Sequence, residues 1–150
     1  MSTPPEEIDL SHITPEQYAA LIASADDDLI LRTVRGTGTG GVIDRVFAGM
    51  RQRFLPDKAR TADVRVQWVV RDEGQEFPYT LTIKDGTCQV AQGTMEAPTV
   101  SFTLELLPFL KLTAGQANGQ KLFITGKLKV GGNPMVAAGV QAYFEAPRPA

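Results

Sequence analysis

The sequence predicts an α+β fold, with a five-stranded, largely antiparallel sheet covered on one face by helices and preceded by a helical N-terminal extension. Two patterns lead to this prediction. Between Val64 and Leu104, apolar and polar side chains alternate in short stretches, as they do in strands with one buried face. On both sides of this region, apolar residues recur at helical spacing. Strands joined by tight turns, with helices before and after them, are typical of this fold class.

The composition is that of an ordinary globular protein and excludes several functional classes. The chain has 150 residues, of which 43% are hydrophobic and 21% charged, and its formal net charge is −2. The net charge gives no overall positive potential that would favour nucleic-acid binding. No apolar run is long enough to span a bilayer. Cys88 is the only cysteine, so an internal disulfide is impossible. The proline- and acid-containing N-terminus does not resemble a signal peptide, and we therefore expect a cytoplasmic protein.

The N-terminal extension is expected to be helical after residues 1–12, which we expect to be a flexible lead or an arm lying on the domain. Thr14, Pro15 and Gln17 form the pattern of a helix start with a capping box. Three aspartates at positions 26–28 then end this helix and begin a short second one, where the helix dipole favours carboxylates without a metal ion. The calcium-loop spacing of acids and glycine is absent, so we predict no metal site.

The glycine-rich stretch at residues 35–41 matches G-x-G-x-x-G literally. A dinucleotide site needs a strand before these glycines, whereas the preceding residues read as a helix. We therefore predict a flexible linker, which divides the chain into an extension at residues 1–41 and a main domain at residues 42–150.

The sequence of the main domain predicts a definite order of helices and strands. A helix is expected from Val42 to Phe54, and the turn Asp85-Gly86 predicts a tight hairpin. Short connections predict that the first four strands form a meander. The expected elements are strands near residues 64–71, 77–84, 87–91, 100–104 and 122–130, and helices near residues 104–112 and 134–144.

The stretch from Leu122 to Asn133, LFITGKLKVGGN, resembles the closing strand of the sterol carrier protein type 2 domain, the nonspecific lipid-transfer family. In that family a similar run precedes a helix that lies over a lipid tunnel. The order of helices and strands resembles the same family over residues 42–145. The resemblance implies that the helices enclose an apolar tunnel. It also implies that the protein binds and transfers a sterol, a fatty acid or a fatty acyl-CoA without covalent chemistry.

Apolar residues of the predicted helices and strands are candidates for the tunnel lining. These are Met50, Trp68, Phe102, Leu106, Phe109, Leu110, Ile124, Met135, Val136, Val140 and Phe144. Three lysines, Lys111, Lys121 and Lys127, are candidates for an anionic headgroup or for transient contact with an anionic membrane surface, although a solvated strand edge also explains them. Tyr18, Leu21 and Ile22 are candidates for covering the tunnel mouth.

Catalytic candidates are few, so we predict a protein that is not an enzyme and needs no cofactor. His12 is the only histidine, and a histidine-based acid/base pair therefore cannot be built. Cys88 alternates with Val90 in a strand, which favours a buried, inert thiol. The alternative to a lipid carrier is an interaction module without a ligand, in which residues 135–144 form a homodimer or partner face. An accessory domain for a catalytic partner chain is also compatible with the sequence.

Overall fold

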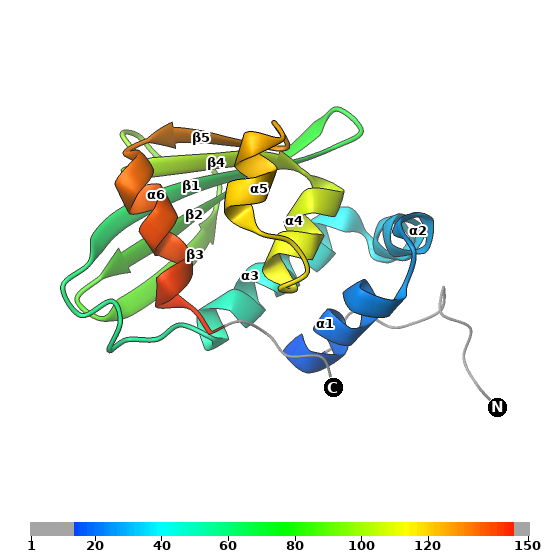
Figure 1. Cartoon of the computed structure of the whole chain (residues 1–150), viewed down its shortest axis with the longest axis horizontal. Helices are drawn as coiled ribbons and strands as arrows, with labels where there is room; N and C mark the ends of the chain where they lie inside the picture. The colour runs from blue at the N-terminus through cyan, green and yellow to red at the C-terminus, as the bar shows by residue number, and fades with distance from the viewer. Residues whose placement is uncertain (1–13, 146–150) are drawn as a thin grey trace.

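The computed structural model describes residues 14–145 and shows an α+β architecture (Figure 1). The predictions for residues 1–12 and for His12 lie outside this range. The helices before the sheet are α1 (Pro15–Ser24), α2 (Asp27–Thr37) and α3 (Thr39–Gln52). The strands are β1 (Asp63–Asp72), β2 (Gln75–Lys84), β3 (Thr87–Gln92), β4 (Val100–Glu105) and β5 (Leu128–Gly132). The remaining helices are α4 (Leu106–Thr113), α5 (Gly119–Ile124) and α6 (Pro134–Val140), followed by a 3-10 turn at Gln141–Tyr143.

The five strands form one sheet in the order β3-β2-β1-β4-β5. Three of the four neighbouring pairs are antiparallel, which confirms the largely antiparallel sheet. The predicted four-strand meander is wrong, because β4 lies beside β1 and runs parallel to it, with Trp68 opposite Phe102. The Asp85-Gly86 hairpin is confirmed: both residues have positive φ, at 54° and 71°, as a two-residue type I′ turn requires.

Hydrogen bonds of the Gln67 side chain account for the position of β4 beside β1 instead of beside β3. The side chain points away from the helices, on the face predicted to be wet, yet it is only 7% exposed. Its amide nitrogen donates to the carbonyl oxygens of Tyr79 and Gly93, at 3.0 and 3.2 Å, and its amide oxygen accepts from the N–H of Met95 at 2.8 Å. These bonds hold the segment after β3 across this face, so that the chain reaches the far side of β1.

The opposite face of the sheet carries the core, and all the helices that cover the sheet lie on that side (Figure 1). Aromatic rings from α3, α4 and the sheet meet there. The ring of Phe47 stacks on Tyr79 at a centroid distance of 4.5 Å and lies 5.4 Å from Phe109. Trp68 lies 4.8 Å from Phe102 and 5.8 Å from Phe109. This cluster fixes α3 and α4 on the central strands.

The predicted flexible linker is wrong, because residues 36–41 are helical apart from a break at Gly38, where φ is 118°. Buried side chains lie on both sides of the break, with Ile30 and Val34 before it and Val42 after it. Their burial offsets the cost of glycine in a helix, which is about 0.5–1 kcal/mol per residue. Gly40 also fits against the ring of Phe77, where a Cβ atom would lie 3.4 Å from a ring carbon.

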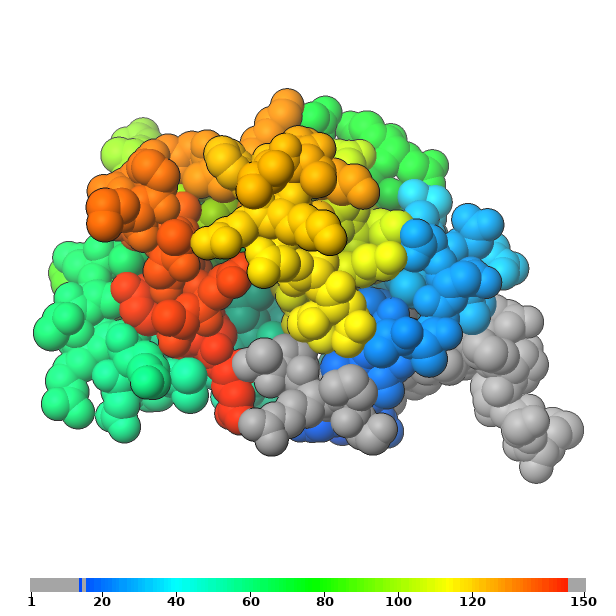
Figure 2. All heavy atoms as spheres, in the orientation of Figure 1, coloured from blue at the N-terminus to red at the C-terminus, as the bar shows by residue number. Residues whose placement is uncertain are grey.

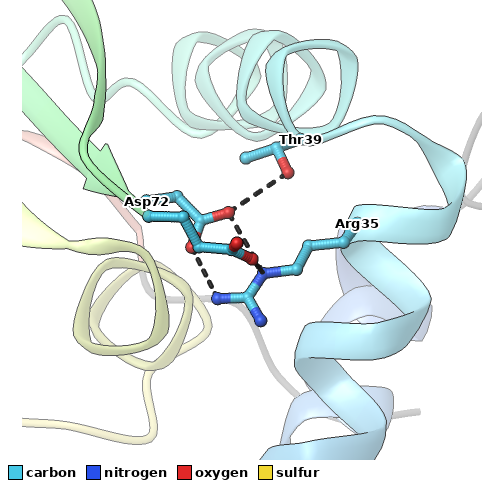
Figure 3. A network of polar contacts seen from close by, with 4 residues as sticks. Arg35, Thr39 and Asp72 are labelled. Carbon is cyan, nitrogen blue, oxygen red and sulfur yellow. Dashed lines mark hydrogen bonds and ion pairs between the residues drawn. The ribbon is translucent and has the colours of Figure 1, made fainter.

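An ion-pair network joins the helical extension to the sheet (Figure 3). The guanidinium of Arg35, on α2, binds the carboxylate of Asp72 at the end of β1, with a shortest distance of 2.7 Å. The Nε atom of Arg35 lies 3.0 Å from a carboxylate oxygen of Glu73. These acids raise the pKa of Arg35, through the hydrogen bond to Asp72 above all. Polar contacts therefore hold α2 on the sheet in addition to its buried side chains, and the predicted division at residue 41 stays a prediction.

The predicted strand at residues 122–130 is wrong in its first half, where the chain forms α5. The side chain of Asn118 caps this helix by accepting from the N–H groups of Gln120 and Lys121. Gly126, with φ of 78°, ends it in a Schellman motif: the N–H of Lys127 donates to the carbonyl of Leu122, and that of Gly126 to the carbonyl of Phe123. The strand therefore begins only at Leu128.

Candidate functional site

Most of the residues predicted to line a tunnel lie together between the sheet and the helices. Seven of them are buried in one cluster: Met50, Trp68, Phe102, Leu106, Phe109, Leu110 and Val140. Val136 and Phe144 are partly buried and pack against that cluster. Ile124 and Met135 do not belong to it, since their side chains are 80% and 84% exposed. Sequence reasoning placed these two inside because a strand was expected at Ile124 and a deeply packed helix at Met135.

Side chains pack closely in the buried cluster, where neighbouring aromatic rings lie 4.5 to 5.8 Å apart, and the predicted tunnel stays a prediction. A hollow of about 130 Å³ lies elsewhere, between α1, α2 and α3. Tyr18, Leu21, Ile22, Val34 and Arg53 are among its lining residues, and none of the predicted tunnel residues reaches it. It is smaller than the ~300–1,000 Å³ of typical ligand pockets. A lipid in the predicted place would therefore have to displace part of the helical cover.

Helices α5 and α6 form a part of that cover in which few residues are buried. They lie on the helical side of the sheet (Figure 1), where α5 packs near β5 and α6 near β4 and β5. The amide of Gln141, just after α6, lies against Gly119 at the start of α5. Gly119 and Val140 are the only buried residues of these two helices. Leu122 and Val136 touch the core but remain partly exposed. A ligand that entered beneath α5 and α6 would bury apolar surface that water now reaches.

The end of the described chain is anchored against α3. The N–H of Leu55 donates to the carbonyl of Tyr143 at 2.7 Å, and that of Glu145 donates to the carbonyl of Arg53 at 2.8 Å. The ring of Phe144 lies 5.7 Å from that of Phe54. Helix α6 is therefore held at both ends, by β5 before it and by this short bridge after it.

The three candidate headgroup lysines differ in their surroundings. The ammonium of Lys111, on α4, lies 2.8 Å from a carboxylate oxygen of Asp27 on α2, so it already has an acidic partner. Lys121, on α5, and Lys127, just after it, are exposed and form no ion pair within residues 14–145. Only these two lysines stay available to an anionic group.

Reactive side chains are sparse in the part of the chain that the structure describes. Cys88 is buried, as predicted, and burial raises its pKa to about 11. Among residues 14–145, no group of three or more His, Cys, Asp or Glu side chains could hold a metal ion. The indole N–H of Trp68 is buried and finds no hydrogen-bond partner among the described residues. No helix in the described range is long and apolar enough to cross a bilayer.

Sequence reasoning missed the roles of two buried polar residues. Gln67 was assigned to a wet face, and no local signal marks the segment that covers it. Tyr18 was read as part of an apolar stripe, yet its hydroxyl bonds the Leu110 carbonyl and the Thr113 hydroxyl on α4, at 2.8 and 2.9 Å. A tyrosine among apolar helix positions is the available signal, because a buried phenol needs a polar partner.

Two curated proteins of yeasts are similar to parts of this chain. The oleate-induced peroxisomal protein POX18 of Candida maltosa is 40% identical over 80 residues, which are 51% of this chain and 63% of that protein. A fatty acid-binding protein of Yarrowia lipolytica is 50% identical over 46 residues, which are 31% of this chain and 36% of that protein. The chain thus spans less than two thirds of the curated relatives that it matches.

Solved structures show the same fold. The apo form of sterol carrier protein 2 from Yarrowia lipolytica aligns with a TM-score of 0.56 and 26% identity, over 70% of this chain and 88% of that one. The sec-alkylsulfatase Pisa1 of Pseudomonas aligns with a TM-score of 0.64 and 20% identity, over 77% of this chain but only 19% of that one. The model of the SCP-2 sterol transfer family matches residues 50–145, more than half of the chain. Residues 50–145 thus carry the family's sequence pattern on the family's fold, and the chain belongs to the SCP-2 sterol transfer family.

Proposed function

We propose that this protein is a non-enzymatic carrier that binds one lipid molecule beneath α5 and α6 and transfers it between membranes. One observation carries the proposal: a thin apolar cover lies directly over a buried cluster of aromatic and aliphatic side chains. Membership of a sterol transfer family and the similarity to a fatty acid-binding protein support it. Of the ligand classes considered, a fatty acid or fatty acyl-CoA fits the names of the curated relatives best.

The energy for binding would come from removing hydrocarbon from water. About 0.8 kcal/mol is gained per buried CH₂, so ten methylenes contribute about 8 kcal/mol, the equivalent of a micromolar dissociation constant before association costs. Opening the cover has a modest cost, because α5 and α6 each bury only one residue. A chain of repeated methylenes offers little to discriminate, so we expect broad specificity.

A matched pair of substitutions on α6 tests the site. Val136 is partly buried against the core, whereas Ala138 on the same helix is exposed. Val136→Trp would fill the space beneath α6 and should weaken binding of a fluorescent fatty acid at least tenfold. Ala138→Trp should leave it within twofold. Circular dichroism and thermal melting check that both variants fold. Equal affinity of the two variants would contradict this location.

The ligand itself is tested by mass spectrometry of small molecules extracted from the natively purified protein. Recovery of a fatty acid, acyl-CoA or sterol in near-stoichiometric amount supports the carrier. An empty protein that also fails to bind the fluorescent fatty acid would favour the alternative, an interaction module without a ligand. Fractionation of cells tests the location, for which cytoplasm stays the prediction.

A further inference from the structure

The exposed large hydrophobic side chains of residues 14–145 all lie on α5 and α6. Phe123, Ile124 and Met135 are 55%, 80% and 84% exposed. Figure 2 shows that these two helices form the outer layer of the same face of the molecule. Large apolar side chains gathered on one face of a monomer mark a contact with a partner or a membrane.

The segment that carries these side chains has charges of one sign. The sequence contains no aspartate or glutamate from residue 106 to residue 144, although the whole chain is net acidic. Lys121 and Ile124 are one helical turn apart on α5, and Lys127 follows directly after the helix. Lys111, the remaining lysine on the helices of this stretch, is paired with Asp27. The face therefore combines exposed apolar groups with free ammonium groups.

We infer that this α5–α6 surface, formed by Lys121, Phe123, Ile124, Lys127 and Met135, docks the protein on anionic lipid bilayers. Lysine is depleted from the centres of protein–protein interfaces, whereas lysines beside aromatic and aliphatic groups are typical of surfaces that lie on anionic membranes. The long lysine side chains can reach the headgroups while the apolar groups enter the boundary with the acyl chains. The inference rests on the proposed function for its purpose, because docking would place the α5–α6 cover of the lipid site against the membrane.

Vesicle flotation with full-length protein tests this surface. The probes are vesicles of phosphatidylcholine alone and vesicles that contain about a third phosphatidylserine, each at low and high salt. The wild type should float with the anionic vesicles at low salt, and the bound fraction should fall as salt rises because screening weakens the lysine contacts. Failure of the wild type to bind anionic vesicles would overturn the inference.

Two double variants with the same charge change separate a local contact from a general charge effect. Lys121→Glu with Lys127→Glu alters the α5–α6 surface, and Lys58→Glu with Lys84→Glu alters exposed lysines elsewhere. The first pair should lower the vesicle partition coefficient at least tenfold, and the second should change it less than twofold. Equal losses in both pairs would contradict a local docking surface.

The apolar part of the surface is tested by the double variant Ile124→Ser with Met135→Ser. It should lower the vesicle partition coefficient at least fivefold without changing thermal stability, since both side chains are exposed.

Sedimentation velocity of the wild type and this variant tests whether a second copy of the chain covers this surface instead of a membrane. A wild-type dimer that the variant converts to monomers would overturn membrane docking. Titration with a fluorescent fatty acid in the absence of vesicles keeps the two proposals apart: its failure would reject the carrier function, while the flotation result would still decide the docking surface.

Discussion

The phenol of Tyr18 on α1 donates a hydrogen bond of 2.8 Å to the main-chain carbonyl oxygen of Leu110 on α4. The two residues are 92 positions apart, and Leu110 is fully buried. This bond fixes the first helix of the extension on a helix of the family domain. The extension thereby becomes part of the core around the candidate lipid site.

Tyr18→Phe should lower the free energy of unfolding by about 1–2 kcal/mol, because it removes a buried hydrogen bond while keeping the ring. The loss stays moderate since the Leu110 carbonyl also accepts from the N–H of Ala114. Urea denaturation measures the change. Ser24→Ala is the control: its hydroxyl bonds to the carbonyl of Ala20 at an exposed site on the same helix, and removing it should cost less than about 0.5 kcal/mol. Equal effects would show that the buried bond does not stabilise the fold.

Removal of residues 1–38 should prevent stable folding. That deletion takes away Ile30 and Val34, which are 1% and 2% exposed, and the Arg35–Asp72 ion pair. Each large aliphatic side chain lost from a core costs about 2–5 kcal/mol, which together approaches the whole stability of a domain. Thermal melting of the truncated chain measures this. A cooperative transition at the wild-type temperature would instead support the predicted independent domain from residue 42.

The burial of the extension's side chains in the core also matters for the prediction that the extension covers the lipid site. Tyr18, Leu21 and Ile22 line the hollow between α1, α2 and α3. Their role in covering the tunnel mouth stays a prediction. Deletion of the extension is therefore a poor test of gating, because it would disturb the core as well as any access route.

Local patterns predicted the parts of the fold that local physics determines. The alternation of Val64, Val66 and Trp68 correctly predicted the buried face of β1, and Asp85-Gly86 correctly predicted the hairpin. The strand predicted over α5 was wrong because Leu122, Ile124 and Leu128 also fit a period of two. The position of β4 depends on bonds from Gln67 to residues 12 to 28 positions away, which no local pattern can reveal.

The burial of the candidate site residues was predicted in part. Phe102, Phe109 and Val140 are buried, as their apolar spacing predicted, and their role in lining a lipid site stays a prediction. Apolar spacing could not show that Ile124 and Met135 face water, because an apolar stripe on a predicted strand or helix does not reveal whether another element covers it. Exposure depends on which helices reach the sheet, and that is a property of the whole fold.

Gln67→Leu should lower the free energy of unfolding by about 2–3 kcal/mol, since it leaves the N–H of Met95 and the carbonyl of Gly93 without their partner. The effect should be concentrated in the segment that crosses the sheet, which hydrogen exchange of residues 93–99 can measure. Arg65→Leu, at an exposed position of the same strand, is the control and should change stability by less than about 0.5 kcal/mol. Unchanged exchange in Gln67→Leu would mean that the crossing is held by other contacts.

Cys88 should react slowly with thiol reagents at pH 8. Burial raises its pKa from 9.0 to about 11, so the thiolate fraction is about 100-fold lower than that of an unperturbed thiol. Because the folded pKa lies above the unfolded one, the stability from the buried neutral thiol is present below pH 9 and is lost as the pH rises through 11. Ellman's reagent measures the rate, with urea-unfolded protein as the reference. Equal rates in the two states would contradict a buried neutral thiol.

Two glycines near the lipid cover should respond in opposite directions to alanine. Gly126 ends α5 with φ of 78°, and a Cβ atom there would meet no neighbour, so Gly126→Ala tests backbone strain alone and should cost about 1 kcal/mol. Gly139 lies within α6, again with open space around a Cβ atom, and Gly139→Ala should stabilise by about 0.5–1 kcal/mol by reducing the entropy of the unfolded chain. Thermal melting distinguishes the two. If alanine at position 126 were neutral, α5 would not end in the left-handed turn that directs the chain into β5, and the exposed apolar groups at its end would lose their fixed position.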